Sequence, residues 1–353
     1  MRKVGLFKEQ NKAVDFVGHL NKSQITALIE EDAGEYAIWV HDEGHVFLAK
    51  KLYAEFQSNE VEVKICKDEV PKKVASKVKV YQPYLTKFLF TACVFVFVLA
   101  TLQTYSGDGS KNGIYSFPPV AKALLIDYPR GDEIVDELIN RFGEESVRKN
   151  QLPEEAAPLV EQYSQSPPWT GFYQILLEKK EKRAMLWNGQ ILSKVKHGEL
   201  WRLFTPVILH LSLLHILFNL LWLLVLGKMV EKNMGRIRYF MFILITGIFS
   251  NLCQYAMTGP YFMGISGVLS ALIGYIWMRK KIAPWEVYLV RKESIYFFII
   301  FIVGFLGIQL ISFFVQKFTG YALPIYIANT GHISGLLFGI LIARTHLLSK
   351  KVY

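Results

Sequence analysis

The sequence predicts an α-helical protein that crosses a membrane six times and carries a small soluble α/β domain at its N-terminus. Hydrophobic residues make up 52% of the 353 residues and aromatic residues 14%, and the mean hydropathy is positive. This composition is typical of a multi-spanning membrane protein. No charged residue occurs from Tyr239 to Met278. Because about 20 apolar residues cross a bilayer as a helix, this run predicts two crossings, with the turn at Gly259-Pro260.

The formal net charge of +10 raises the question of a nucleic-acid partner. Cations in membrane proteins collect on cytoplasmic loops, and no nucleic-acid-binding signature accompanies them here, so we interpret the charge as topology. Cys66, Cys93 and Cys253 are scattered along the chain, which favours neither a disulfide framework nor a metal site. We expect no cofactor. Residues 1–8 lack a long apolar core, so we expect no cleavable signal peptide.

Residues 1–70 form the expected cytoplasmic α/β domain, which we interpret as regulatory or structural. The patterns at Val4–Phe7 and Tyr36–Val40 predict strands, and the amphipathic stretches Asn11–Leu20 and Gly44–Phe56 predict helices. The domain shows no cluster of catalytic residue types, since its histidines are dispersed. They are His19, His41 and His45.

The rest of the chain divides into four predicted parts. A charged linker over 71–85 contains Lys72, Lys73, Lys77 and Lys79, and a first transmembrane helix follows over 86–104. The polar segment 105–186 is too long for a loop without structure of its own. Helical patterns at Asp132–Phe142 and Glu154–Tyr163 predict a small extracytoplasmic helical insert. Residues 187–348 hold transmembrane helices two to six, at about 203–226, on either side of Pro260, at 294–315 and at 327–341.

The cations predict the orientation of these helices. Two basic loops and the C-terminal tail fall on one side of the membrane, whereas the loops near Pro260 and Pro324 carry almost no cations. By the positive-inside rule both termini are cytoplasmic, which places the protein in the cytoplasmic (inner) membrane with helices two, four and six all entering from the outer face. The basic residues are Lys228, Lys232, Arg236, Arg238, then Arg279, Lys280, Lys281, Arg291, Lys292, then Arg344, Lys350 and Lys351.

The fourth and sixth crossings contain the residues that suggest chemistry. Ser266 lies among glycines a few residues into the fourth crossing, and a polar group at that depth is a functional candidate, although a packing seam of small residues is the commoner use. His332, Gly335 and Gly339 share one face of the sixth crossing. Small residues on both helices allow close approach of the backbones. We therefore expect the Ser266 hydroxyl and the His332 imidazole to meet, as nucleophilic catalysis requires.

No carboxylate is available to complete a triad inside the bilayer. Neither Asp nor Glu occurs between Glu231 and Glu286, nor after Glu293, so a hydrolytic mechanism here is a Ser-His dyad without the usual acid. His215 and Asn219 are four residues apart on the second crossing and could stabilise an oxyanion together with backbone amides.

The roles of the two histidines of the second crossing are less direct to predict than those of Ser266 and His332. Taken alone, His215 fits a core histidine bonded to a carbonyl slightly better, but its pairing with Asn219 and the two other motifs favour the functional interpretation. We expect His210 to support the site from its outer part.

These residues resemble the rhomboid family of intramembrane serine proteases, of the bacterial GlpG type. The resemblance covers about residues 187–345 and the first crossing, and the N-terminal domain is similar in size and pattern to that of GlpG-type rhomboids. Each motif alone is weak, and the order, the spacing and the membrane parity together carry the resemblance. The matching residues are His210, His215 and Asn219, then Gly264, Ser266 and Gly267, then His332, Gly335 and Gly339, with Trp201-Arg202 ahead of them.

The resemblance implies roles for several residues. Ser266 would be the nucleophile and His332 the general base and then acid. His215, Asn219 and the Ser266 amide would form the oxyanion hole. Trp201 and Arg202 would brace the first loop, and the fifth crossing would be a lateral gate. The partners would be the lipid bilayer and transmembrane protein substrates, cleaved in or near their membrane segments.

The chain departs from the family pattern at two places. It has Ser270 where the family often has a Tyr that stacks on the histidine. The insert between the first and second crossings also exceeds the usual first loop, so it could select substrates or cover the site.

Two other functions fit parts of the sequence. A proteolytically silent rhomboid-like binder of membrane clients would share the fold, although the presence of Ser266 and His332 argues against it. A small transporter could use intramembrane histidines as a proton relay. The absence of intramembrane carboxylates and of an evident internal repeat argues against the transporter.

Overall fold

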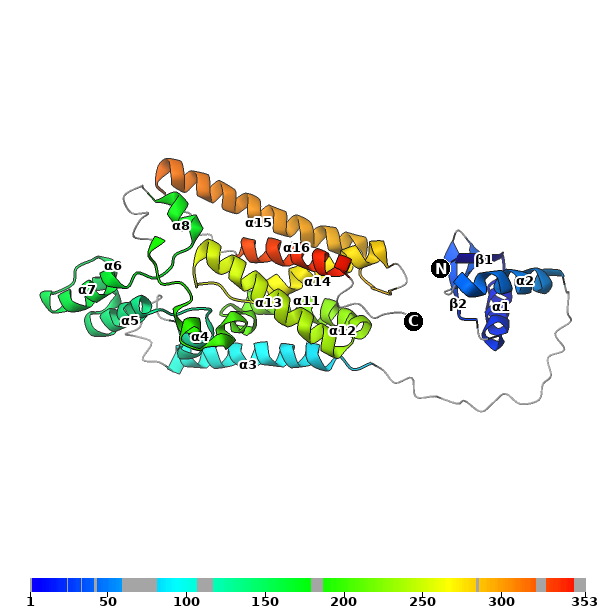
Figure 1. Ribbon diagram of the computed structural model, residues 1–353, viewed down its shortest axis with the longest axis horizontal. Coiled ribbons are helices and arrows are strands. Elements are labelled where there is room, and N and C mark those ends of the chain that lie inside the picture. Colours follow the sequence, from blue (N-terminus) through cyan, green and yellow to red (C-terminus); the bar gives the residue numbers. More distant parts are fainter. Residues whose placement is uncertain are drawn as a thin grey trace. The chain divides into compact units, whose positions relative to one another are not determined.

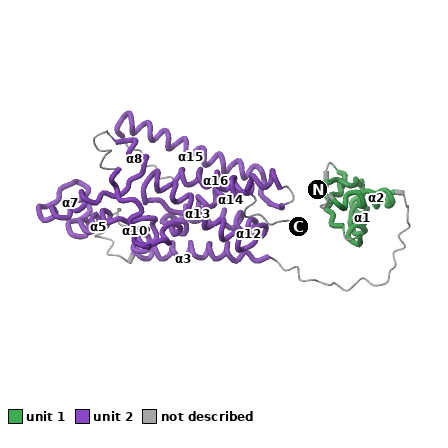
Figure 2. The backbone as a smooth tube through the Cα atoms, in the orientation of Figure 1, with its two compact units in different colours: residues 1–80 green, residues 81–353 purple. Residues whose placement is uncertain are grey.

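The structure is a computed structural model in two compact units, residues 1–80 and 81–353 (Figure 2). It describes residues 2–23, 25–32, 34–40, 43–58, 81–106, 117–178, 187–283, 286–321 and 328–345. Most of the predicted linker, with its four lysines, lies outside the described residues. So do Cys66, His41, Pro324 and the C-terminal Lys350 and Lys351.

The N-terminal unit is a three-stranded antiparallel sheet with two helices. Its strands have the order β1-β3-β2, and its core includes the fully buried side chains of Phe16, Leu20 and Ile38. The second strand along the chain, β2, was not predicted because Ala27–Asp32 is apolar for only its first half and ends in three acidic residues. The elements are β1 (Arg2–Phe7), α1 (Gln10–Lys22), β2 (Ala27–Asp32), β3 (Glu35–Val40) and α2 (Val46–Ser58).

The second unit is built on long apolar helices (Figure 1). Among the described residues, four helices are long and apolar enough to cross a membrane: Tyr84–Tyr105, Leu213–Met234, Arg236–Thr258 and Lys292–Thr319. Two further helices, α14 and α16, are 17 residues each, or about 26 Å long at 1.5 Å per residue. They are too short to be counted as membrane-crossing helices by length alone, so the number of six crossings stays a prediction. The bounds are α3 (Tyr84–Ser106), α11 (Leu213–Trp222), α12 (Lys228–Met234), α13 (Arg236–Thr258), α14 (Ser266–Ile282), α15 (Lys292–Thr319) and α16 (Asn329–Thr345).

The second crossing differs from its predicted bounds of 203–226. Residues 200–208 form two short 3-10 turns, and the helix begins only at Leu213. It then continues through a π-helical turn, Leu223–Gly227, to Met234, so Lys228 and Lys232 lie in the helix instead of a loop.

The contacts of a buried carboxylate explain why the helix continues to Met234 although it contains charged residues. Glu231 is fully buried and accepts hydrogen bonds from the Leu85 amide at 3.1 Å and the Thr86 amide at 2.9 Å. These amides are unpaired donors of the first turn of α3, and a negative charge there is favourable. The Thr86 hydroxyl donates a third bond at 2.7 Å.

The described part of the predicted insert, residues 117–178, contains five short α-helices, and a sixth, α10, follows the insert. Its apolar core includes Ile134, Leu138, Ala156 and Leu159, which come from α5, α7 and the turn between them. The predicted helical patterns correspond to α5 and α7. The helices are α4 (Pro119–Leu124), α5 (Arg130–Phe142), α6 (Glu144–Arg148), α7 (Ala157–Gln165), α8 (Phe172–Leu177) and α10 (Ser193–Lys196).

The centre of the second unit is the pair α14 and α16 (Figure 1). Helix α13 packs against both of them, α15 runs along one side and α3 along the other. The core around α14 includes the buried side chains of Val268, Leu272, Tyr239 and Phe242. This arrangement buries most of α14, whose first residue is Ser266.

Candidate active site

Glycines bring α14 and α16 into backbone contact. A Cβ atom added at Gly335 would overlap the carbonyl oxygen of Gly267, and one added at Gly339 would overlap that of Ala271. Gly274 of α14 similarly faces the carbonyl oxygen of Leu336. The two helices therefore run in parallel at a distance that only glycine permits, as in other close membrane helix pairs.

This register sets Ser266 beside His332. His332 lies one turn before Gly335, and Ser266 directly precedes Gly267, so both side chains extend from the N-terminal ends of the two helices of this seam. The distance between Ser266 Oγ and His332 Nε2 is 2.8 Å. This is the separation expected for a nucleophile and its general base.

The other ring nitrogen of His332 has no orienting partner among the described residues. Nδ1 is buried and unpaired there. If Nε2 accepts the serine proton, Nδ1 carries the hydrogen of the neutral ring, and this donor meets no carboxylate. Ser270, one turn after Ser266, instead donates its hydroxyl to the Ser266 carbonyl oxygen at 2.9 Å.

Gly264 lies against the two predicted oxyanion donors. Its φ of +112° is left-handed and favours glycine. A Cβ atom at Gly264 would lie 2.9 Å from His215 Nε2 and 3.4 Å from Asn219 Nδ2. Both side chains of α11 therefore converge on the backbone two residues before Ser266, as stabilisation of an oxyanion would require.

His210 contacts Asn219 and does not line the cavity. It lies in the segment before α11, and its Nε2 is 3.2 Å from Asn219 Nδ2. Nδ1 is 3.4 Å from the Ile208 carbonyl oxygen. These contacts fit a ring protonated at Nδ1 that accepts one N–H of the Asn219 amide. The structure therefore places His210 where it holds the Asn219 side chain in position.

A cavity of about 990 Å³ opens onto this group. Ser266, His332, His215 and Asn219 all line it. One wall is the apolar face of α15, with Phe298, Phe301, Ile302 and Phe305. Phe218 of α11 also lines the cavity and stacks on Phe301, with ring centroids 5.6 Å apart.

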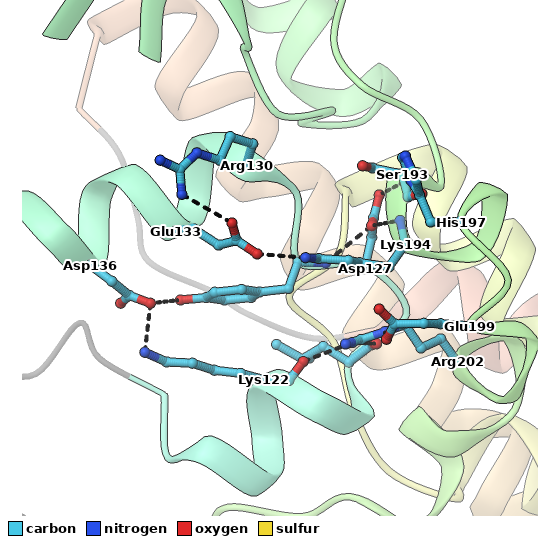
Figure 3. Close-up of polar contacts among 12 residues, drawn as sticks. Lys122, Asp127, Arg130, Glu133, Asp136, Ser193, Lys194, His197, Glu199 and Arg202 are labelled. Carbon is cyan, nitrogen blue, oxygen red and sulfur yellow. Dashed lines mark hydrogen bonds and ion pairs between the residues drawn. The ribbon is translucent and has the colours of Figure 1, made fainter. Parts of the chain in front are cut away.

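Trp201 and Arg202 lie away from the serine. The indole of Trp201 is 54% exposed, whereas Arg202 is buried. Arg202 donates through Nη1 to the carbonyl oxygens of Lys122 at 2.7 Å and Leu125 at 2.9 Å, at the end of α4 (Figure 3). Its Nε donates to Glu199 at 2.6 Å. Arg202 therefore joins the insert to the segment before α11.

Asp127 anchors the insert a second time (Figure 3). Its carboxylate accepts hydrogen bonds from the amides of Ser193 at 2.8 Å and Lys194 at 3.0 Å, at the start of α10. The Tyr255 hydroxyl of α13 donates to the same carboxylate at 3.2 Å. The insert is thereby fixed to the C-terminal end of α13.

Asp132 of α5 reaches the loop that precedes Ser266. The Tyr261 hydroxyl donates to Asp132 Oδ1 at 2.5 Å, and Oδ2 is buried without a partner among the described residues. Burial raises the pKa of Asp132 to about 6, against the lowering effect of the Tyr261 hydrogen bond. Burial also raises the pKa of Tyr261, and the neighbouring Asp132 carboxylate adds to that rise.

Tyr261, Asp132 and Gln254 were not predicted from the sequence as residues of the site. Gln254 Oε1 accepts the Gly331 amide at 2.8 Å and so fixes the turn that carries His332. A signal for Gln254 was present, because Ser250, Asn251 and Gln254 are polar residues in an otherwise apolar crossing. Asp132 and Tyr261 are 129 residues apart, and no local pattern connects them. Among the described residues, no group of three or more potential ligands is close enough to hold a metal ion.

The second part of the chain is similar to known proteins. The Rhomboid domain family model matches residues 197–349. The chain is 34% identical over 171 residues to the "Rhomboid protease GlpG" of Salmonella paratyphi A, across 48% of this chain and 57% of that protein. The chain thus spans little more than half the length of this relative. The residues that meet at the α14–α16 seam all lie inside the matched region.

Proposed function

Because residues 197–349 form a domain of the rhomboid family, we propose that this chain is an intramembrane serine protease. Its substrates are membrane proteins, cut in or near their transmembrane segments through a Ser-His dyad. The observation that carries the proposal is the 2.8 Å distance between Ser266 Oγ and His332 Nε2, in a cavity large enough for a peptide.

In this proposal His332 acts as base and then as acid. Nε2 removes the proton of the Ser266 hydroxyl as Oγ attacks the substrate carbonyl carbon. His215, Asn219 and the Ser266 amide stabilise the resulting oxyanion. His332 returns the proton to the leaving amine as the peptide C–N bond breaks. Water then hydrolyses the acyl-enzyme by the same two proton transfers.

We also propose six crossings with both termini cytoplasmic, in the cytoplasmic membrane. Helices α14 and α16 are short because each begins below the outer surface. Before α14, the loop that leads to Ser266 lies inside protein. Irregular backbone at membrane depth is tolerated where it lines a cavity, and the segment Phe262-Met263 lines this one. Basic residues at the ends of α14 and α16, Arg279, Lys280 and Arg344, support the inward direction of both helices.

The test is covalent labelling with a fluorophosphonate probe in lipid. We expect wild-type protein to be labelled and both Ser266→Ala and His332→Ala to lose the label, because the first lacks the nucleophile and the second its base. Gln57→Ala, at an exposed position of the N-terminal unit, is the control and should label as wild type. Folded wild-type protein that takes no label and cleaves no transmembrane protein would refute the protease. It would favour the proteolytically silent binder, for which the unpartnered Nδ1 of His332 is the motivating observation.

A further inference from the structure

Helix α8 of the insert forms part of the cavity that contains the serine. Thr170, Tyr173 and Gln174 line the same cavity as Ser266 and His332. These three residues precede the region matched by the rhomboid domain, which begins at residue 197. The insert therefore adds a wall to the cavity that the family domain does not itself provide.

The insert helix is held rigidly in this place. Gly171, with φ +88°, brings the start of α8 against the end of α13, where an added Cβ atom would lie 2.5 Å from the backbone of Met257. The Trp169 indole donates to the Tyr255 carbonyl oxygen at 3.0 Å. On the other side, Lys317 of α15 donates to the Leu176 carbonyl oxygen at 2.8 Å, at the end of α8. Figure 1 shows α8 beside the outer end of α15.

Helix α15 presents polar side chains to the cavity at the level of α8. Gln309, Ser312 and Gln316 line the cavity, and their spacing places them on one face of a helix whose remaining cavity residues are apolar. Ser312 is buried and is the hydrogen-bond partner of the Tyr173 hydroxyl. Polar side chains inside a membrane helix are costly and usually functional.

The amide of Gln174 is fixed by the helix that carries it. Its Nε2 donates to Glu178 Oε1 at 3.0 Å. A primary amide has two N–H donors and a carbonyl acceptor, so this bond uses one donor. The adjoining helices α8 and α15 thus both present amide side chains to the cavity.

We propose that α8 and the polar face of α15 form a subsite for the extended outer segment of a transmembrane substrate. A helical segment satisfies its own backbone groups, whereas an extended one loses those bonds and needs donors and acceptors from its surroundings. The amides of Gln174 and Gln316 supply both. Gln309, whose Oε1 already accepts a hydrogen bond from the Asn329 amide at 2.7 Å, supplies its N–H donors. Specificity would then depend on a polar, unwound segment next to the cleavage site. This inference rests on the proposed protease function.

The experiment compares Gln174→Ala with Leu176→Ala, an exposed position of the same helix. Two single-spanning test substrates are used, with identical membrane segments. One has a Gly/Ser-rich outer segment and the other a continuous Ala/Leu helix. For the Gly/Ser substrate, Gln174→Ala should raise KM about fivefold, which corresponds to one lost hydrogen bond of about 1 kcal/mol, with kcat and fluorophosphonate labelling unchanged. Leu176→Ala should leave KM, kcat and labelling at wild-type values.

Three results would overturn the subsite. They are an unchanged KM in Gln174→Ala, an equal rise in KM for Leu176→Ala, and an equal effect on the helical substrate. A second readout uses the Ser266→Ala background, with a photo-crosslinking amino acid at position 174 or 176. We expect crosslinks to the Gly/Ser substrate from position 174 only, and their absence would also refute the subsite. Failure of the protease itself is distinct, because wild-type protein would then neither label nor cleave.

Discussion

The close contact of glycines between α14 and α16 predicts how much activity a larger residue in this seam would cost. Replacing Gly335 by Ala adds a methyl group whose carbon would overlap the Gly267 carbonyl oxygen and lie 3.0 Å from the Gly267 carbonyl carbon. Both atoms belong to the backbone, so the helices themselves have to separate. An ordinary van der Waals contact needs a shift of about 1 Å between the two backbones.

A shift of that size would disrupt the dyad. The Ser266 Oγ to His332 Nε2 distance would grow from 2.8 Å to about 3.8 Å, which is beyond a hydrogen bond. A misplacement of about 1 Å at a reacting centre typically lowers the rate about 100-fold. We therefore expect Gly335→Ala to reduce the rate of fluorophosphonate labelling, and kcat for a transmembrane substrate, by about that factor.

The matched control is Gly304→Ala on α15. A Cβ atom there has nothing within 4 Å, so the same chemical change meets open space and should leave the labelling rate within about twofold of wild type. Thermal unfolding of both variants in the same detergent separates loss of geometry from loss of fold. A Gly335→Ala protein that is folded and labels at the wild-type rate would refute the idea that the seam sets the Ser266–His332 distance.

Three further predictions concern other contacts of the site. Asn219→Ala should lower kcat about 100-fold with a smaller change in KM, as for other oxyanion donors. His210→Ala should lower kcat less, because it removes only the contact at 3.2 Å that positions Asn219. Equal losses of kcat for the two variants in steady-state assays would contradict this order. Because the folded-state pKa of Asp132 is raised from 3.8 to about 6, its burial favours the protonated form, so stability should fall as pH rises from about 4 to about 6 and then level off. The fall is about 3 kcal/mol at most, and Asp132→Asn should abolish it in thermal melts at pH 4.5 and 7; a pH dependence unchanged in that variant would contradict the assignment. Arg202→Ala should expose the insert to limited proteolysis, since it removes the donor to two carbonyl oxygens, of which that of Leu125 is buried. Arg130→Ala, which removes two ion pairs of a half-exposed side chain, should not.

Much of the fold follows from hydrophobic pattern and charge. The charge-free run from Tyr239 to Met278 and its break at Pro260 correspond to α13 and α14. The second crossing was misplaced because hydropathy alone treats Lys228 and Glu231 as the end of a helix. Burial of Glu231 depends on the first turn of α3, about 145 residues earlier in the chain, and such a long-range partner is invisible in a local window.

The geometry of the site was predictable to different degrees. The meeting of Ser266 and His332 was expected from the small residues around each, because close packing of two helices has few solutions. A supporting role for His210 was expected, but its contact with Asn219 was not, since the predicted helix included His210, whereas in the structure His210 precedes α11. The insert's contribution to the cavity could not be read from sequence, because α8 meets α15 only through the fold.

The hydrogen bonds of Asp127 have a consequence for the order in which the protein folds during synthesis. Its carboxylate is bound by the amides of residues 193 and 194 and by the hydroxyl of Tyr255, which is 128 residues further along the chain. At a synthesis rate of 5–20 residues per second, Tyr255 emerges on the order of 10 s after Asp127. During that interval the insert has emerged without its anchor on α13. Insertion of α13 therefore completes the insert's docking, and the outer wall of the cavity forms only after the third long helix has entered the membrane.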